Sequence, residues 1–144
     1  MEGDLDRARV PAPGPRCITD KLWQHTCCEI FIARKGLPGY YEFNLAPSGE
    51  WAVYAFERYR EPAMLANVSA LDPQIAVRRR AKTLELDALI PLDRLSPTHA
   101  GGALALALSA VVEDQDGSLS YWALQHRSGK PDFHHPDAFA LELE

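Results

Sequence analysis

The sequence has few of the residues and patterns that mark several common classes of protein. Its cysteines, Cys17, Cys27 and Cys28, are three in number and match no zinc-site spacing. Cys27 and Cys28 are adjacent and would point to opposite faces of a strand, so we expect no disulfide between them. No apolar run is long enough to cross a membrane, and residues 1–16 lack the apolar core of a signal peptide. We therefore expect a reduced, cytoplasmic protein with no membrane partner.

Positive charge is also scarce. The chain has 15 Lys and Arg against 20 Asp and Glu, a formal net charge of −5. The one basic cluster, "VRRRAK" (77–82), is short and lies between strand-like segments, which indicates a solvated strand end. No nucleic-acid partner is expected, because nothing supplies the basic stripe that neutralises phosphates. The sequence also lacks a phosphate-binding glycine loop, a nucleophile elbow and a metalloprotease helix motif.

Alternation of apolar and polar residues is the dominant pattern in the 144 residues, a length that fits one domain. Alanine and leucine in "GGALALALSAVVED" favour a helix, but strict alternation favours a strand there. The turn-forming stretches "APSG" and "EDQDG" predict hairpins. The Pro-bearing segments 61–73 and 91–102 are expected to be connections with short helical turns. The pattern predicts an antiparallel β-sandwich, jelly-roll or immunoglobulin-like, with strands within 25–33, 40–45, 51–59, 82–90, 101–114, 118–126 and 138–143.

One face of the predicted sheet carries a mixture of polar and aromatic side chains. If the first two long strands pair, His25, Glu29 and Phe31 lie beside Tyr40, Glu42 and Asn44. Small residues of a later strand would leave room opposite them: Ala103, Ala105, Ala107 and Ser109. Such a face suits a polar ligand such as a sugar, whose hydroxyls bind carboxylates and amides. The alternative is an ordinary solvated outer face, and the pattern leaves both open.

Two features raise the question of catalysis or metal binding. Glu29 and Glu42 could act as a carboxylate pair, but the sequence supplies no deep cleft between them, so we do not expect an enzyme. His134 and His135 lie in "GKPDFHHPDAF" (129–139), where a structural loop, a ligand contact and a metal site are all considered. Neighbouring histidines of an extended segment diverge, which favours the loop and gives no predicted metal ligands.

Four ordered segments resemble a known family: "LWQHTCCEIFI", "YYEFNLAPSGEWAVYAF", "LSAVVEDQDGSLSYWAL" and "GKPDFHHPDAFALEL". Together they are similar to the DOMON-like superfamily, in its bacterial branch related to carbohydrate-binding module family 9. The resemblance runs from about Leu22 to the end of the chain. It implies a β-sandwich that binds sugars or haem without chemistry of its own. Where sugar-binding relatives carry an acidic pair, this chain has His25 and Thr26.

We therefore predict a non-catalytic module that most plausibly binds a carbohydrate and needs no cofactor. One alternative is a haem-binding module that uses Met64, the only internal methionine, and one histidine. Another is a hydrolase that uses the His134/His135 loop with a carboxylate. The predicted ligand-binding residues lie on the mixed face and at its rim: Trp23, His25, Glu29, Glu42, Asn44, His134 and His135.

A separate prediction concerns the N-terminal region. Residues 1–21 look like a strand remnant and a Pro-rich loop, and residues 22–144 like the DOMON-like sandwich domain. Relatives carry further strands upstream, so we expect a sandwich that lacks its N-terminal strands. The edge that this exposes predicts a homodimer.

Overall fold

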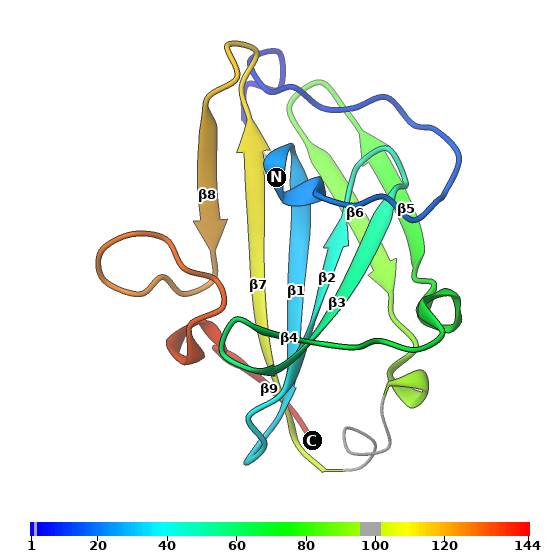
Figure 1. Cartoon of the computed structure of the whole chain (residues 1–144). Helices are drawn as coiled ribbons and strands as arrows, with labels where there is room; N and C mark the ends of the chain where they lie inside the picture. The colour runs from blue at the N-terminus through cyan, green and yellow to red at the C-terminus, as the bar shows by residue number, and fades with distance from the viewer. Residues whose placement is uncertain (2, 96–101) are drawn as a thin grey trace.

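The structure is a computed structural model that describes residues 1, 3–95 and 102–144, and it shows an all-β, antiparallel, sandwich-like fold, as predicted (Figure 1). Short 3-10 helices lie between strands: η1 (Leu22–Gln24), η2 (Val68–Leu71), η3 (Leu92–Arg94) and η4 (Pro136–Ala138). The strands are β1 (Cys27–Arg34), β2 (Tyr40–Leu45), β3 (Trp51–Arg58), β4 (Glu61–Ala63), β5 (Gln74–Arg79), β6 (Leu84–Leu89), β7 (Leu104–Glu113), β8 (Leu119–Ala123) and β9 (Leu141–Leu143).

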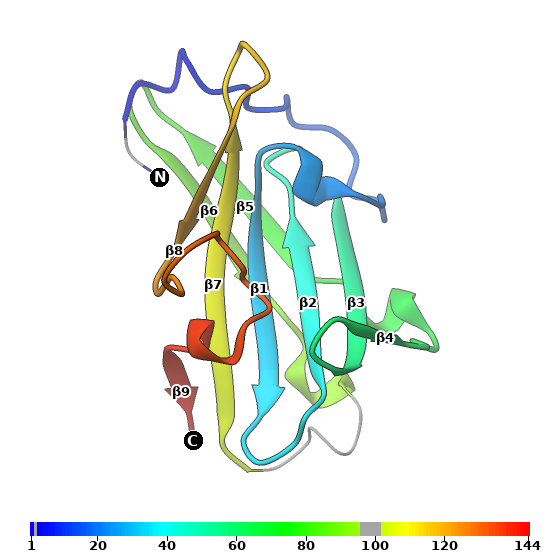
Figure 2. The same cartoon turned by 60° about the vertical axis from the view of Figure 1, so that its left-hand side comes forward.

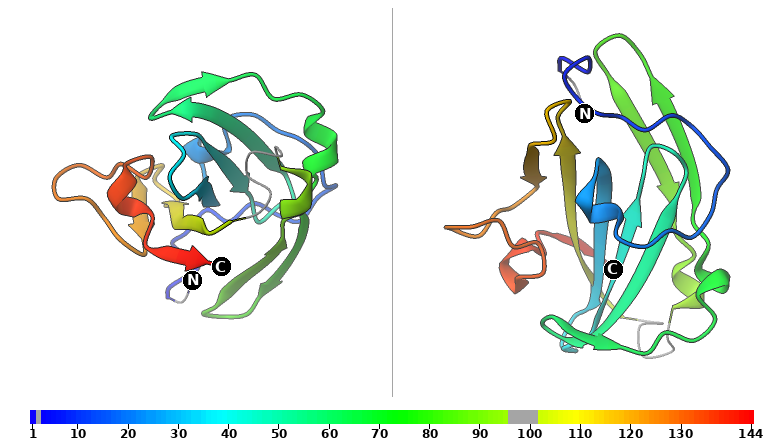
Figure 3. Two further views of the ribbon diagram at one scale, coloured as in Figure 1. Left: turned by 90° about the horizontal axis from the view of Figure 1, so that it is seen from below. Right: turned by 45° about the horizontal axis from the view of Figure 1, so that its top comes forward.

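The strands form two layers. Within the described residues, the larger sheet has the order β4-β3-β2-β1-β7-β8. β8 pairs with residues 109–113 of β7 and β9 pairs with residues 104–106, so both lie along the same edge of β7. β5 and β6 form a separate hairpin that packs against one face of the larger sheet (Figure 3).

The core lies between the larger sheet and the β5–β6 hairpin. Alternation in β2 and β3 directs Tyr41, Phe43, Leu45, Trp51 and Val53 into this core. Phe43 and Leu45 have no exposed surface, and burial of each such side chain contributes about 1.5–3 kcal/mol. Every residue of β2 is buried, so the other face of this strand is covered as well. That second covered face carries the candidate site.

Both predicted hairpins are present. β2 and β3 are joined by residues 46–50, where the amide of Ala46 donates to the carbonyl of Glu50 at 2.9 Å. Gly49 has a φ of +95°, a conformation that favours glycine. β7 and β8 are joined through Gly117, which has a φ of +84°, and the amide of Asp114 donates to the carbonyl of Ser118.

The Pro-bearing segments and the last strand differ in part from the prediction. Residues 61–73 contain the expected helical turn, η2, but also β4, which is too short to show alternation. Residues 91–102 contain η3, and the strand predicted from residue 101 begins at Leu104; residues 96–101 lie outside the described residues. The strand predicted at 138–143 begins only at Leu141, because η4 occupies Pro136–Ala138.

The basic cluster ends a strand, as predicted. Val77, Arg78 and Arg79 are the last residues of β5. The guanidinium of Arg78 pairs with Glu85 at 2.9 Å and with Asp87 at 2.7 Å on the neighbouring β6. These partners are side chains of the same hairpin, so the cluster is an ordinary charged strand surface.

The N-terminal segment crosses one end of the sandwich (Figure 3). The amino group of Met1 donates to the carbonyl of Leu84 at 2.8 Å, and the amide of Arg9 donates to that of Glu113 at 2.6 Å. Leu5 is almost fully buried. The domain boundary at residue 22 and the homodimer stay predictions. In the described part of the chain, no helix has the length and apolar character needed to cross a membrane.

Candidate functional site

The candidate site is built on the face of the larger sheet opposite the core. In the β1–β2 register, Glu29 lies opposite Asn44 and Phe31 lies opposite Glu42. On the other side of β1, Glu29 lies opposite Ser109 of β7. Because paired residues project to the same face of a sheet, these side chains share one surface. The predicted neighbours Glu29, Phe31, Glu42 and Asn44 are therefore brought together.

The small residues of β7 lie beside this group and not opposite it. Ala107 pairs with Phe31 and Ala105 pairs with Ala33, in the same sheet and on the same face. The expectation that they would face the polar residues across a gap is wrong, because β7 is the direct neighbour of β1. They leave no space there, because Ala107 and Phe31 are buried in a cluster with Ala138 of η4.

The C-terminal segment between β8 and β9 covers this face (Figure 2). It places Phe133 and His134 against the sheet, and the ring of His134 lies 5.1 Å from that of Phe31 and 5.1 Å from that of Phe56. The segment is held at Asp132, whose carboxylate pairs with the guanidinium of Arg60 at 2.8 Å. The face is therefore not a solvated outer surface.

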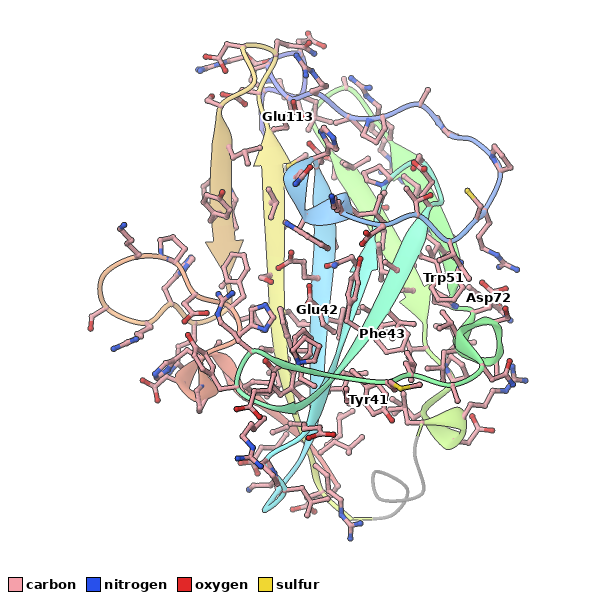
Figure 4. The ribbon with its side chains drawn as sticks, in the orientation of Figure 1. Tyr41, Glu42, Phe43, Trp51, Asp72 and Glu113 are labelled. Atoms are coloured by element: carbon pink, nitrogen blue, oxygen red, sulfur yellow. The ribbon has the colours of Figure 1, made fainter. Side chains whose placement is uncertain are left out.

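Sheet and segment together line an open pocket of about 410 Å³, a size in the range of small-molecule sites. Figure 4 labels one of its residues, Glu42, on β2. The aromatic side chains that line it are Trp23, Tyr54, Phe56, Tyr121 and Phe133. The charged or titratable side chains that line it include Glu29, Glu42, Arg60, Asp132 and His134.

The two glutamates of the pocket are buried acids. Burial raises the pKa of Glu29 to about 7; the nearby Glu42 carboxylate adds to the shift and a hydrogen bond from Ser109 Oγ, at 3.0 Å, opposes it. Burial also raises the pKa of Glu42, against a 2.9 Å hydrogen bond from Asn44 Nδ2 and the charge of Arg60. Near neutral pH, both the protonated and the ionised form of Glu29 are therefore populated, and such shifted pKa values are common at binding and catalytic sites.

His134 is a neutral member of the site near neutral pH. Burial lowers the pKa of its imidazole to about 4, and the charge of Arg60 adds to the shift while Asp132 opposes it. Its Nδ1 and the hydroxyl of Tyr40 are hydrogen-bonded at 2.9 Å, and its Nε2 lies 3.6 Å from Glu42 Oε2. These contacts hold the imidazole ring next to the Glu42 carboxylate, but the neutral ring does not compensate the charge of that carboxylate.

The remaining predicted residues divide into two groups. Asn44 is fully buried beside the carboxylates, while Trp23 lines the pocket from η1. His135 does not line it; its Nδ1 accepts a hydrogen bond from the amide of Asp137 at the start of η4. His25 is also elsewhere, with 64% of its side chain exposed and its Nδ1 2.8 Å from Glu113 Oε2.

The position of His25 corrects the predicted face. β1 begins at Cys27, so alternation does not extend back to His25. Glu113 lies near the end of β7 (Figure 4) and also pairs with Arg9 at 2.6 Å. His25 and Glu113 therefore belong to a contact that holds the N-terminal segment.

Several pocket residues were not singled out from the sequence. Tyr54 and Phe56 lie opposite Glu42 and Tyr40 in the β2–β3 register. Alternation in "WAVYAFERY" separates them from Trp51 and Val53, so the signal for these two was present. Tyr121 lies opposite Val111 in the predicted β7–β8 hairpin, so its strand was predicted as well. Arg60 carried no such signal, because it lies in the turn after β3 and is held by Asp132 of the C-terminal segment.

The haem alternative does not fit the residues present. Met64 is fully exposed in the segment after β4 and is not one of the residues that line the pocket. His134, which does line it, is bonded to Tyr40 through Nδ1. The two side chains do not share a site, so they do not supply the Met and His ligands of a haem iron.

We expect alanine at His134 or His135 to lower the free energy of unfolding by about 1–2 kcal/mol, because each replacement leaves a hydrogen-bonding group without its partner. EDTA should leave the melting temperature of the wild-type protein unchanged. Across the described residues, no group of three His, Cys, Asp or Glu side chains is arranged to hold a metal ion. Thermal melts with and without EDTA, together with the zinc content of the purified protein, test this. Tight zinc that is lost in the double variant would contradict it.

Comparison with known proteins supports the fold. No protein-family model matches the chain, and a search of the curated proteins found no match. Among solved structures, the chain is similar to a protein from Bacteroides uniformis described as a "putative carbohydrate-binding protein", with a TM-score of 0.52 and 16% identity. The match covers 92% of this chain, which spans 65% of the length of that one. The chain thus shares its β-sandwich fold with that protein.

Proposed function

We propose that this protein is a non-catalytic ligand-binding module that binds a carbohydrate in the pocket between the larger sheet and the C-terminal segment. The observation that carries the proposal is the lining of that pocket, in which aromatic rings surround two buried carboxylates. The printed description of the Bacteroides uniformis structure and the resemblance to the DOMON-like superfamily support the same ligand class. We also propose that this protein is bacterial and cytoplasmic and that it belongs to that superfamily.

The chemistry of the lining matches a sugar on both of its surfaces. The C–H faces of a sugar ring are apolar and pack on aromatic rings such as Trp23, Tyr54 and Tyr121. Sugar hydroxyls donate hydrogen bonds, and the carboxylates of Glu29 and Glu42 accept them. Hydrogen bonds to a charged acceptor contribute about 1.5–3 kcal/mol each, so the carboxylates dominate the expected affinity.

We expect Glu42→Ala to remove sugar binding while the protein stays folded. Loss of a hydrogen bond to a charged acceptor lowers affinity about 10- to 100-fold, which is enough to abolish weak binding. Thermal shift and calorimetric titration with glucose, galactose and mannose measure it, because a ligand that binds the folded state raises the melting temperature.

The matched control is Glu85→Ala, which removes a carboxylate of β6 that pairs with Arg78 outside the pocket. It should bind sugars like the wild type. Equal binding by the Glu42→Ala variant would place the ligand elsewhere. Release of nitrophenol from nitrophenyl glycosides would contradict the non-catalytic part of the proposal.

A further inference from the structure

The pocket is lined by three carboxyl groups, those of Glu29, Glu42 and Asp132, and by one arginine, Arg60. The guanidinium of Arg60 lies 2.8 Å from the carboxylate of Asp132, so this pair is already matched. His134 faces Glu42 at 3.6 Å, but its imidazole is neutral near pH 7. Within the described residues, no lysine or arginine forms an ion pair with Glu29 or Glu42. A ligand cation would supply the missing charge.

Hydrogen-bond acceptors are also in excess beside the carboxylates. Asn44 is 0% exposed, and its Nδ2 donates to Glu42 Oε1. Its Oδ1 is buried and has no hydrogen-bond partner in the described part of the chain. Asn44 lies opposite Glu29 in the β1–β2 register, so this acceptor stands next to both carboxylates. Asn44 itself does not line the pocket, so it acts on a ligand through Glu42, whose carboxylate it holds in place.

The aromatic lining favours the same kind of group. Trp23 and Tyr54 meet edge to face, with ring centroids 5.6 Å apart, and both line the pocket. The faces of aromatic rings carry partial negative charge and attract a cation that lies within about 6 Å. A primary ammonium group has a positive charge, three donors and no acceptor, which complements the carboxylates and the aromatic rings together.

We propose that the pocket takes an amino sugar, a carbohydrate that carries a primary ammonium group, with that group directed toward Glu29 and Glu42. This inference rests on the proposed carbohydrate-binding function and names the ligand class of the same site. The sugar ring packs against the aromatic lining, and the ammonium group replaces the cation that the pocket lacks.

Calorimetric titration at pH 6.5 tests it with glucosamine, galactosamine and mannosamine, each beside its neutral and N-acetylated counterpart. At least one amino sugar is expected to bind ten times more tightly than both counterparts. In Glu42→Gln this preference should fall to about one, because glutamine keeps a hydrogen-bonding oxygen and loses the charge; the ratio of the two affinities is the readout, since the affinity for neutral sugars also falls when a charged acceptor is lost. Glu85→Gln is the matched control and should keep the preference.

A second measurement needs no variant. A bound cation favours the ionised form of Glu29, which is partly protonated at pH 6.5, so binding of an amino sugar should release a fraction of a proton. Titrations in buffers of different ionisation enthalpy measure this release, which neutral sugars should not show. The titratable or charged groups that line the same pocket are Glu42 on β2, Tyr54 on β3, Arg60 after β3, Tyr121 on β8, and Asp132 and His134 of the C-terminal segment.

The outcomes separate this inference from the proposed function. If neutral or N-acetylated sugars bind as tightly as amino sugars and no proton is released, the ammonium inference fails and the carbohydrate-binding function stands. If methylammonium chloride binds as tightly as the amino sugars, the ring contributes nothing and the sugar class is wrong. If none of these probes binds, both proposals fail.

Discussion

Leu45→Ala is expected to lower the free energy of unfolding by about 2–5 kcal/mol. The side chain of Leu45 has no exposed surface and lies in the core between the larger sheet and β5–β6. Its truncation loses the transfer free energy of the removed carbons and leaves a cavity that the surrounding strands fill only in part. Urea denaturation followed by circular dichroism measures the change.

Leu89→Ala is the matched control, because it makes the same chemical change at a side chain that is 65% exposed on β6. Surface substitutions of this kind usually change stability by no more than about 0.5 kcal/mol. If the two variants were equally stable, the layer of β5 and β6 would not be packed on the larger sheet as described here.

Glu29→Gln is expected to become progressively more stable than the wild type as the pH rises. The pKa of Glu29 is about 7 in the folded protein against an ordinary value of 4.5, so the folded state holds this proton more tightly than the unfolded chain. Below about pH 4.5 the carboxyl is protonated in both states. Between pH 4.5 and 7 the unfolded chain loses the proton first, and the wild type loses stability on the order of 3 kcal/mol. Glutamine has no proton to lose.

The difference between the two proteins is the quantity to measure, in urea at pH 4.5, 6 and 8. His134 has the opposite effect: its pKa is lowered from 6.5 to about 4, so its contribution to stability is lost as the pH falls through that window. The subtraction removes the His134 contribution, which both proteins share. A flat difference for Glu29→Gln would mean that Glu29 is not a buried acid.

The residues that the larger sheet contributes to the site could be predicted from the sequence, because successive side chains of a strand point to alternate faces of the sheet. Once β1 and β2 are taken as a hairpin pair, Glu29 and Phe31 must share a face with Glu42 and Asn44. The same rule extends to Tyr54 and Phe56 through the β2–β3 register. Local periodicity therefore specifies which side chains stand together within neighbouring strands.

The position of the C-terminal segment over the site could not be predicted, because it depends on contacts between distant parts of the chain. The pair of Arg60 with Asp132 joins residues 72 positions apart. Residues 124–140 have no periodicity that tells which face they cover. The order of the strands also depends on contacts between distant parts of the chain. Because β7 is next to β1, Ala107 lies beside Phe31 in the same sheet and does not face it across a gap.

The pocket therefore has two parts: a floor, formed by strands of the larger sheet, and a wall, formed by the loop before β9. Floor residues such as Glu42 stand on strands whose other face is the core, so changes there are constrained by folding. The wall, residues 124–137, is a largely exposed loop fastened at few points, chiefly at Asp132 and His134. Replacement of the loop residues before Asp132 offers a way to change ligand preference while the sandwich is kept.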